Sequence, residues 1–187
     1  MTAQVPESVI FEDREFDLCG LKGEDPFKPE AHGLSPKPLH TACWRGFVCT
    51  FAVRDERLVL EELEVGLRSW GPDDGGDSES PPIAGVEAQR NEKQGTAFYR
   101  SMSLPLEFTG RILIGRDFIG ALYVHMGFQK ACTYREVVEL VFEGGQLVES
   151  RNMSDAMKEI RLRLEDHGGR PTEDLIQWIE ERFSLDY

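Results

Sequence analysis

The chain has 187 residues, of which 40% are hydrophobic and 29% are charged, and both values are typical of a globular domain of ordinary size. It carries 21 basic and 34 acidic residues, which give a formal net charge of −13. Phosphate backbones and anionic lipid surfaces repel such a charge, and no cluster of Lys and Arg reverses it locally. We therefore expect neither nucleic acid nor a membrane as a direct partner.

The same composition indicates a cytoplasmic protein. Residues 1–7 lack the basic and apolar regions of a secretion signal, and no apolar run approaches the roughly 18 residues of a membrane helix. The four cysteines, Cys19, Cys43, Cys49 and Cys132, are too sparse for a disulfide scaffold. We expect free thiols that are buried as small apolar groups.

The first part of the chain predicts two β-hairpins separated by an irregular segment. Residues 9–11 and 15–19 flank a polar loop of three residues, 12–14, and the following segment, 20–38, is rich in Pro and Gly. A strand over 43–53 then places Phe47, Cys49, Phe51 and Val53 on one face, which we expect to be core. Asp55 and Glu56 form the turn into a partner strand over 58–65.

The middle of the chain is acidic and poor in apolar residues, and we expect a solvated loop over 71–96. A third hairpin is predicted over 104–115, with its turn at Thr109 and Gly110, and a fourth over 136–148, with its turn at 143–145. The same order of elements, a hairpin, a long connection and a second hairpin, thus occurs twice. The two occurrences define pseudo-halves 1–70 and 97–150. Either an internal duplication or a simple antiparallel meander produces this order.

The C-terminal region, 152–187, changes to a helical period and predicts a pair of helices. Ser154 is a suitable N-cap for a first helix that ends near Gly168, and Thr172 opens a second helix that extends to Phe183. The fold class is therefore a single α+β domain, mainly antiparallel β. We expect a hairpin-based sheet system, either a sandwich or a partly open barrel, followed by two amphipathic helices.

The sequence contains no strong motif for metal binding, phosphate binding or nucleophilic catalysis. His32, His40, Cys43 and Cys49 lie in one segment, and all four belong to residue types that bind metals. In a continuous strand, however, Cys43 and Cys49 would lie roughly 20 Å apart, at about 3.3 Å per residue. No phosphate-binding loop is present, and no oxyanion-hole motif flanks a Cys–His pair. We expect no metal, no cofactor and no catalytic residue.

The most distinctive local string is Trp44-Arg45-Gly46-Phe47, which permits two interpretations. In the structural one, Trp44 caps the core, Arg45 pairs with a carboxylate, and Gly46 allows a bulge or a close backbone approach. In the functional one, the string is a contact patch, since Trp, Arg and aromatic residues are enriched at binding hot spots. Tyr123 and His125 are further binding candidates, although a histidine beside aromatic side chains is also common in ordinary packing.

Segments 41–47 with 50–51, 109–114 and 123–128, together with Tyr134, resemble a family of small uncharacterised bacterial proteins. The resemblance covers about residues 9–150, and phenylalanine at Phe47, Phe51 and Phe128 replaces another aromatic residue. It implies a bacterial, cytoplasmic, sheet-rich protein and carries over no catalytic residue.

For function, the sequence favours a non-enzymatic acidic protein that binds a basic protein partner, for instance a bacterial immunity protein that neutralises it. The alternative is an enzyme or small-ligand binder with a pocket between the two β halves, where Arg45, Tyr123 and His125 converge. A third hypothesis is a scaffolding homo-oligomer, and the sequence leaves the oligomeric state open.

Overall fold

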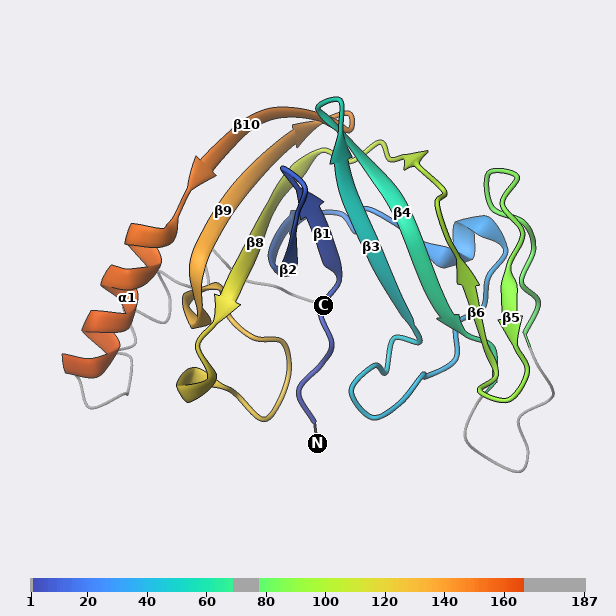
Figure 1. The fold of residues 1–187 in the computed structure, drawn as a ribbon, viewed down its shortest axis with the longest axis horizontal. Coiled ribbons are helices and arrows are strands. Elements are labelled where there is room, and N and C mark those ends of the chain that lie inside the picture. The colour runs from blue at the N-terminus through green and yellow to red at the C-terminus, as the bar shows by residue number, and fades with distance from the viewer. Residues whose placement is uncertain (1, 69–77, 167–187) are drawn as a thin grey trace.

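The computed structural model describes residues 2–68 and 78–166 of the chain, and 48% of the structure is β-strand. Its ten strands belong to one mixed sheet (Figure 1). They are β1 (Ser8–Phe11), β2 (Arg14–Gly23), β3 (Phe47–Arg54), β4 (Arg57–Gly66), β5 (Gln89–Asn91), β6 (Thr96–Tyr99), β7 (Leu104–Pro105), β8 (Gly110–Phe118), β9 (Tyr134–Glu143) and β10 (Gln146–Asn152). The helices are α1 (Ser154–Asp166) and the short 3-10 segments η1 (Pro29–His32), η2 (Gly120–Leu122) and η3 (Ala131–Thr133).

Seven strands form a ring in the order β10, β9, β8, β2, β1, β3 and β4. Neighbours pair antiparallel except β1 and β3, which are parallel. The ring closes where β10 meets β4, at Gln146 and Arg57, and the strands spread apart from that end (Figure 1). Of the two predicted sheet arrangements, the partly open barrel therefore describes the structure and the sandwich does not.

Tight turns with positive φ angles join the paired strands. Asp55 and Glu56 have φ of 48° and 59°, and Gly144 and Gly145 have φ of 52° and 79°, as a two-residue turn between twisted strands requires. The second and fourth predicted hairpins are confirmed. The first also forms, but its loop has two residues, because Arg14 already pairs with Phe11 at the start of β2. The prediction of a three-residue loop was wrong.

The third predicted hairpin does not form. β7 pairs with β4, whereas β8 lies between β2 and β9. Gly110 is the first residue of β8 rather than part of a turn, and a Cβ atom there would lie 2.3 Å from the carbonyl oxygen of Lys22. Glycine is thus needed at this position for the close approach of β2.

The prediction of a loop over 71–96 was also wrong in part. β5 and β6 extend the sheet beyond β4, and residues 69–77 lie outside the described part of the chain. Strands of the two predicted halves also join directly, since β2 of the first pairs with β8 of the second.

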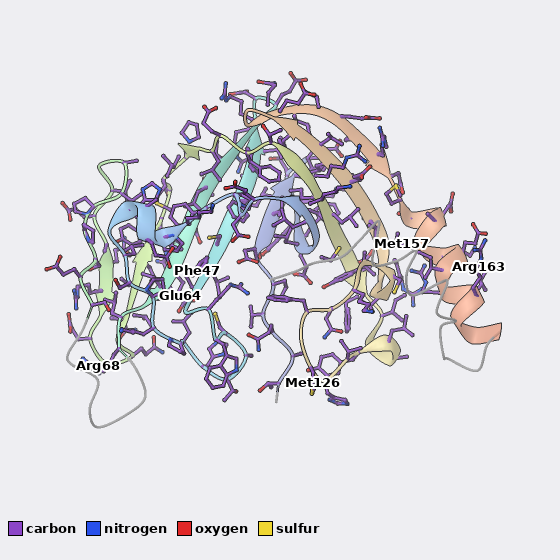
Figure 2. All side chains as sticks on the ribbon, turned by 180° about the vertical axis from the view of Figure 1, so that it is seen from behind. Phe47, Glu64, Arg68, Met126, Met157 and Arg163 are labelled. Atoms are coloured by element: carbon purple, nitrogen blue, oxygen red, sulfur yellow. The ribbon has the colours of Figure 1, made fainter. Side chains whose placement is uncertain are left out.

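The ring has an apolar cluster on each face. Inside it, alternate residues such as Ile112 and Ile114 belong to the main core, while Leu113 between them faces a second, outer cluster. Helix α1 covers this outer cluster with Met157, labelled in Figure 2, and Ile160.

The side chain of Arg161 fixes α1 to the segment that leads into β9. Its Nη1 atom donates to the carbonyl oxygens of Cys132 at 2.9 Å and Tyr134 at 2.8 Å. The first predicted helix is thus confirmed from Ser154. The described residues contain this one α-helix. The second predicted helix, from Thr172, lies outside the described residues. In the described part of the chain, no helix has the length and apolar character needed to cross a membrane.

Candidate functional site

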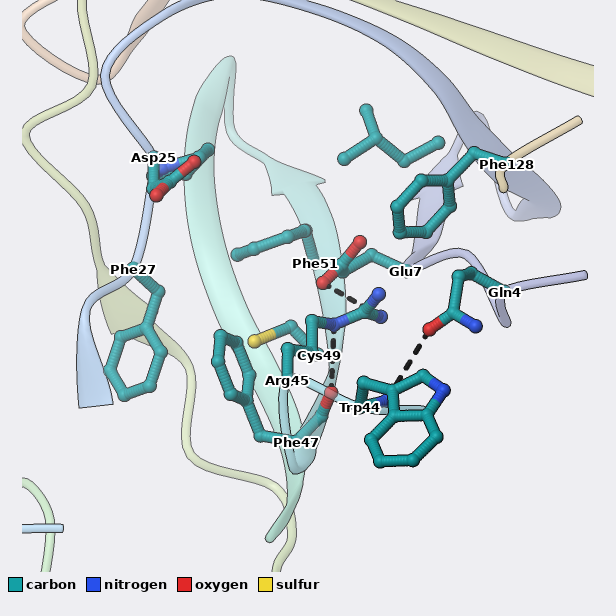
Figure 3. A pocket seen from close by; sticks show the side chains of 12 residues that line it. Gln4, Glu7, Asp25, Phe27, Trp44, Arg45, Phe47, Cys49, Phe51 and Phe128 are labelled. Atoms are coloured by element: carbon teal, nitrogen blue, oxygen red, sulfur yellow. Dashed lines mark hydrogen bonds and ion pairs between the residues drawn. The ribbon is translucent and has the colours of Figure 1, made fainter. Parts of the chain in front are cut away.

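A pocket of about 590 Å³ is drawn in Figure 3. It lies at the end of the ring opposite the contact between β4 and β10, because its lining includes Phe47, which pairs with Val65 near the end of β4. This volume lies within the range of about 300–1,000 Å³ that is usual for small-molecule sites. The N-terminal segment, β2 with its following loop, the turn before β3, β3 itself and the loop between η2 and η3 all contribute to it. The lining residues are Gln4, Glu7, Leu18, Asp25, Pro26, Phe27, Trp44, Arg45, Phe47, Cys49, Phe51 and Phe128.

The wall of the pocket is largely aromatic. Alternation along β3 places Phe47, Cys49 and Phe51 on its inner face, as the sequence predicts. Phe128 arrives from the loop after η2, and the neighbouring Gly127 accepts a hydrogen bond of 2.8 Å from the backbone of Gln4. An apolar ligand body would therefore find ring surfaces from segments far apart in the sequence.

A sharp turn before β3 brings Arg45 into this wall. Gly46 has a φ of 82°, and a Cβ atom there would lie 2.5 Å from the carbonyl oxygen of Lys37. Only glycine meets both conditions without strain. Beyond the turn, Arg45 Nε donates to the carbonyl oxygen of Phe47 at 2.9 Å, and Nη2 donates to that of Val5 at 3.0 Å.

Arg45 also forms an ion pair with Glu7, and both side chains are largely buried. The Nη2 atom of Arg45 lies 3.0 Å from Oε1 of Glu7, and the side chains are 18% and 6% exposed. Burial raises the pKa of Glu7 above its ordinary value, although the Arg45 charge opposes the shift; the Asp25 carboxylate adds to it. Burial and the Asp25 charge thus disfavour the charged form of Glu7, and the Arg45 charge offsets this effect only in part.

Two atoms of this pair are buried and have no hydrogen-bond partner among the described residues: Glu7 Oε2 and Arg45 Nη1. The guanidinium carbon of Arg45 lies 5.7 Å from the ring centroid of Phe47 and 5.4 Å from that of Phe128, which compensates the cation in part. The carboxylate of Glu7 is compensated through Oε1, by the Arg45 charge, whereas Oε2 has no partner among the described residues. An unmade hydrogen bond on a buried polar group costs about 1–3 kcal/mol, and more on a charged one.

Three of the five predicted binding residues line this pocket: Trp44, Arg45 and Phe47. Arg45 pairs with a carboxylate and Gly46 allows a close backbone approach, as predicted. Trp44, however, is 60% exposed at the pocket and does not cap the core, so that part of the structural interpretation was wrong.

Tyr123 and His125 are not among the residues that line the pocket. They are exposed on the loop after η2, where their rings contact each other with centroids 5.1 Å apart. The predicted convergence of Arg45 with these two residues is therefore not observed. Nor does the pocket lie evenly between the two predicted halves, because Phe128 is, among the described residues, its one lining residue from beyond the first half.

Glu7, Gln4 and Asp25 were missed as site residues. Nothing in the local pattern of the N-terminal segment distinguishes Glu7 from the many other carboxylates. The one signal was Arg45 itself, since an arginine in an apolar string requires a buried partner.

The side chains that could bind a metal or act as nucleophiles are dispersed or buried in the described residues. Over residues 2–68 and 78–166, no three side chains of His, Cys, Asp or Glu gather closely enough to hold a metal ion. The four cysteines are free and buried, and burial raises the pKa of the Cys49 thiol well above its ordinary value and that of Cys43 as well. The thiol at the pocket is thus held in its less reactive protonated form.

Comparisons with protein-family models, with curated proteins and with solved structures find no match to this chain. The assignment of function therefore depends on the geometry of the pocket.

Proposed function

We propose that the protein binds a small molecule with an apolar body and one polar head group in the pocket at the open end of the ring. The observation that carries this proposal is the buried carboxylate of Glu7, whose Oε2 atom has no hydrogen-bond partner among the described residues, in the lining of a cavity of about 590 Å³. Polar groups that converge in a mostly apolar cavity characterise ligand sites.

The contents of the pocket favour binding over catalysis. Its rings offer apolar contact and its ion pair offers hydrogen bonds, while the Cys49 thiol is kept protonated by burial. The hypothesis of a basic protein partner, including an immunity role, stays a prediction that draws on the net charge of −13.

A fluorescence titration with N-phenyl-1-naphthylamine tests the proposal, because this uncharged probe emits strongly only in apolar surroundings. We expect saturable binding with one site per chain. Cys49→Phe places a ring in the cavity and should weaken binding at least tenfold.

Cys19→Phe is the matched control. Cys19 and Cys49 are both 1% exposed, but Cys19 belongs to the outer cluster beneath α1. Both variants overpack a buried site, at a cost of about 1–3 kcal/mol. Equal loss of binding in the two variants, or no binding to the unmodified protein, would overturn the proposal. Leu18→Phe, a second substitution in the pocket lining, replaces Cys49→Phe if that variant does not fold.

A further inference from the structure

The charges around the pocket are not balanced. Its lining contains two carboxylates, Glu7 and Asp25, and one guanidinium, Arg45, so the formal charge of the site is −1. The whole chain, at −13, adds a field of the same sign. A ligand with one positive charge would neutralise the site, whereas an anion would add to the imbalance.

The unpaired carboxylate oxygen of the site points in the same direction, whereas the unpaired Arg45 Nη1 atom is a donor that the rings of Phe47 and Phe128 compensate in part. Glu7 Oε1 is engaged by Arg45, whereas Oε2 is a buried acceptor with no donor among the described residues. A ligand that satisfies this oxygen must bring a hydrogen-bond donor. A charged N–H group makes a bond to a carboxylate that is roughly twice as strong as a bond between neutral groups.

The aromatic wall is also compatible with a cation. Phe47 and Phe128 already face the guanidinium of Arg45 at 5.7 Å and 5.4 Å, which shows that these rings tolerate a positive charge at the pocket. Trp, the best partner for a cation among the aromatic residues, is also present in the lining as Trp44. Aromatic rings and carboxylates are the groups with which proteins commonly bind ammonium groups.

We propose that the ligand of this pocket is a protonated hydrophobic amine, whose ammonium group donates to Oε2 of Glu7 while its apolar body packs against the phenylalanine rings. This inference rests on the proposed function and adds the charge and the hydrogen-bonding character of the head group. Deprotonation of Glu7 favours such a ligand, so binding should tighten as the carboxyl loses its proton. The charged groups that act on Glu7 are Arg45 and Asp25, and the Glu7 charge in turn raises the pKa of the Cys43 and Cys49 thiols.

Three probes with the same aromatic body and different heads test the inference by isothermal titration calorimetry: 1-naphthylmethylamine, 1-naphthylmethanol and 1-naphthylacetate. We expect the protonated amine to bind at least tenfold more tightly than the alcohol, and the carboxylate to bind most weakly. Glu7→Gln should abolish the preference for the amine over the alcohol.

Glu139→Gln is the matched control, because Glu139 is a buried carboxylate held by Arg111 and Arg151 on β8 and β10, away from the pocket. It should retain the preference for the amine. Asp25→Asn is a second test, at an exposed position of the pocket lining, and it should weaken binding of the amine two- to fivefold and reduce the preference for the amine over the alcohol.

The outcomes separate the two proposals. Equal affinity of the unmodified protein for the amine and the alcohol would overturn the amine assignment and leave the proposed function standing. A preference for the amine that survives both Glu7→Gln and Asp25→Asn would overturn it as well. If none of the three probes binds, the proposed function falls and the amine assignment falls with it.

Discussion

Arg45 Nη2 lies 3.0 Å from Glu7 Oε1, and this contact joins the turn before β3 to the segment that precedes β1. The same Arg45 atom donates to the carbonyl oxygen of Val5. The N-terminal segment is thereby held against the pocket wall by one side chain. The ion pair is a structural link as well as the polar group of the candidate site.

Loss of Arg45 should destabilise the fold strongly, because it leaves the Glu7 carboxylate buried without its cation. We expect Arg45→Met to lower the free energy of unfolding by about 3–5 kcal/mol. The double variant Glu7→Leu with Arg45→Met removes both charges and should be more stable than Arg45→Met alone. Urea denaturation measures both effects, and additive losses in the double variant would contradict the description of a coupled pair.

Gly46 should tolerate no side chain, since it combines a positive φ with contact to the backbone of Lys37. We expect Gly46→Ala to cost more than about 2 kcal/mol, beyond the roughly 1 kcal/mol of an unfavourable φ alone. Gly85 is the control, because its φ is 80° but no atom lies within 4 Å of the position that a Cβ atom would take there. Comparable melting temperatures for Gly46→Ala and Gly85→Ala would show that the turn does not require the close approach.

The contribution of Asp17 and Glu7 to stability should fall as the pH rises through the carboxyl range. Burial raises the pKa of Asp17 and of Glu7 above their ordinary values of 3.8 and 4.5. Between the ordinary and the raised value, the folded state binds more protons than the unfolded state, so the free energy of unfolding decreases with rising pH in that window. Other carboxylates contribute to the total, and the comparison with variants isolates the contribution of Asp17.

Asp17→Asn should flatten this slope while it retains an acceptor for Tyr134, whose hydroxyl donates to Asp17 Oδ2 at 2.8 Å. Tyr134→Phe should do the opposite. The Tyr134 hydroxyl lowers the pKa of Asp17, so its removal raises that pKa further and widens the window. Denaturation curves at several pH values would decide the matter, and identical slopes for the unmodified protein and Asp17→Asn would refute the role of Asp17.

The four thiols should be inert in the folded protein. Cys19, Cys43, Cys49 and Cys132 are buried, and burial raises the pKa of each. We expect no rapid reaction with 5,5′-dithiobis(2-nitrobenzoate) at about pH 8 under native conditions, and four reactive thiols after unfolding in denaturant. A thiol that reacts in the native protein as fast as a free cysteine would contradict this burial.

Sequence patterns correctly predicted the elements that depend mainly on neighbouring residues, such as strand faces, tight turns and a helix start. Alternation placed Cys49 and Phe51 in the core, and the polar pair Asp55 and Glu56 marked a true turn. Ser154 correctly marked the start of α1. The prediction failed at Gly110, because a glycine needed for the close approach of two strands has the same local signature as a glycine in a turn.

The candidate site was predictable only in part, because its residues meet through long-range strand pairing. Trp44, Arg45 and Phe47 stood out as a string, and Arg45 was expected to find a carboxylate. That Glu7 supplies it depends on the parallel pairing of β1 with β3, which is a long-range feature that no turn or period records. Tyr123 and His125 were selected for their residue types, and the loop after η2 holds them outside the pocket.

A crystal structure of the protein with 1-naphthylmethylamine tests the central claim most directly. We expect the naphthyl ring to lie among Phe27, Phe51 and Phe128, with the ammonium nitrogen within about 2.7–3.2 Å of Glu7 Oε2. An empty pocket at a saturating concentration of the amine, or the amine bound instead at Tyr123 and His125, would contradict it.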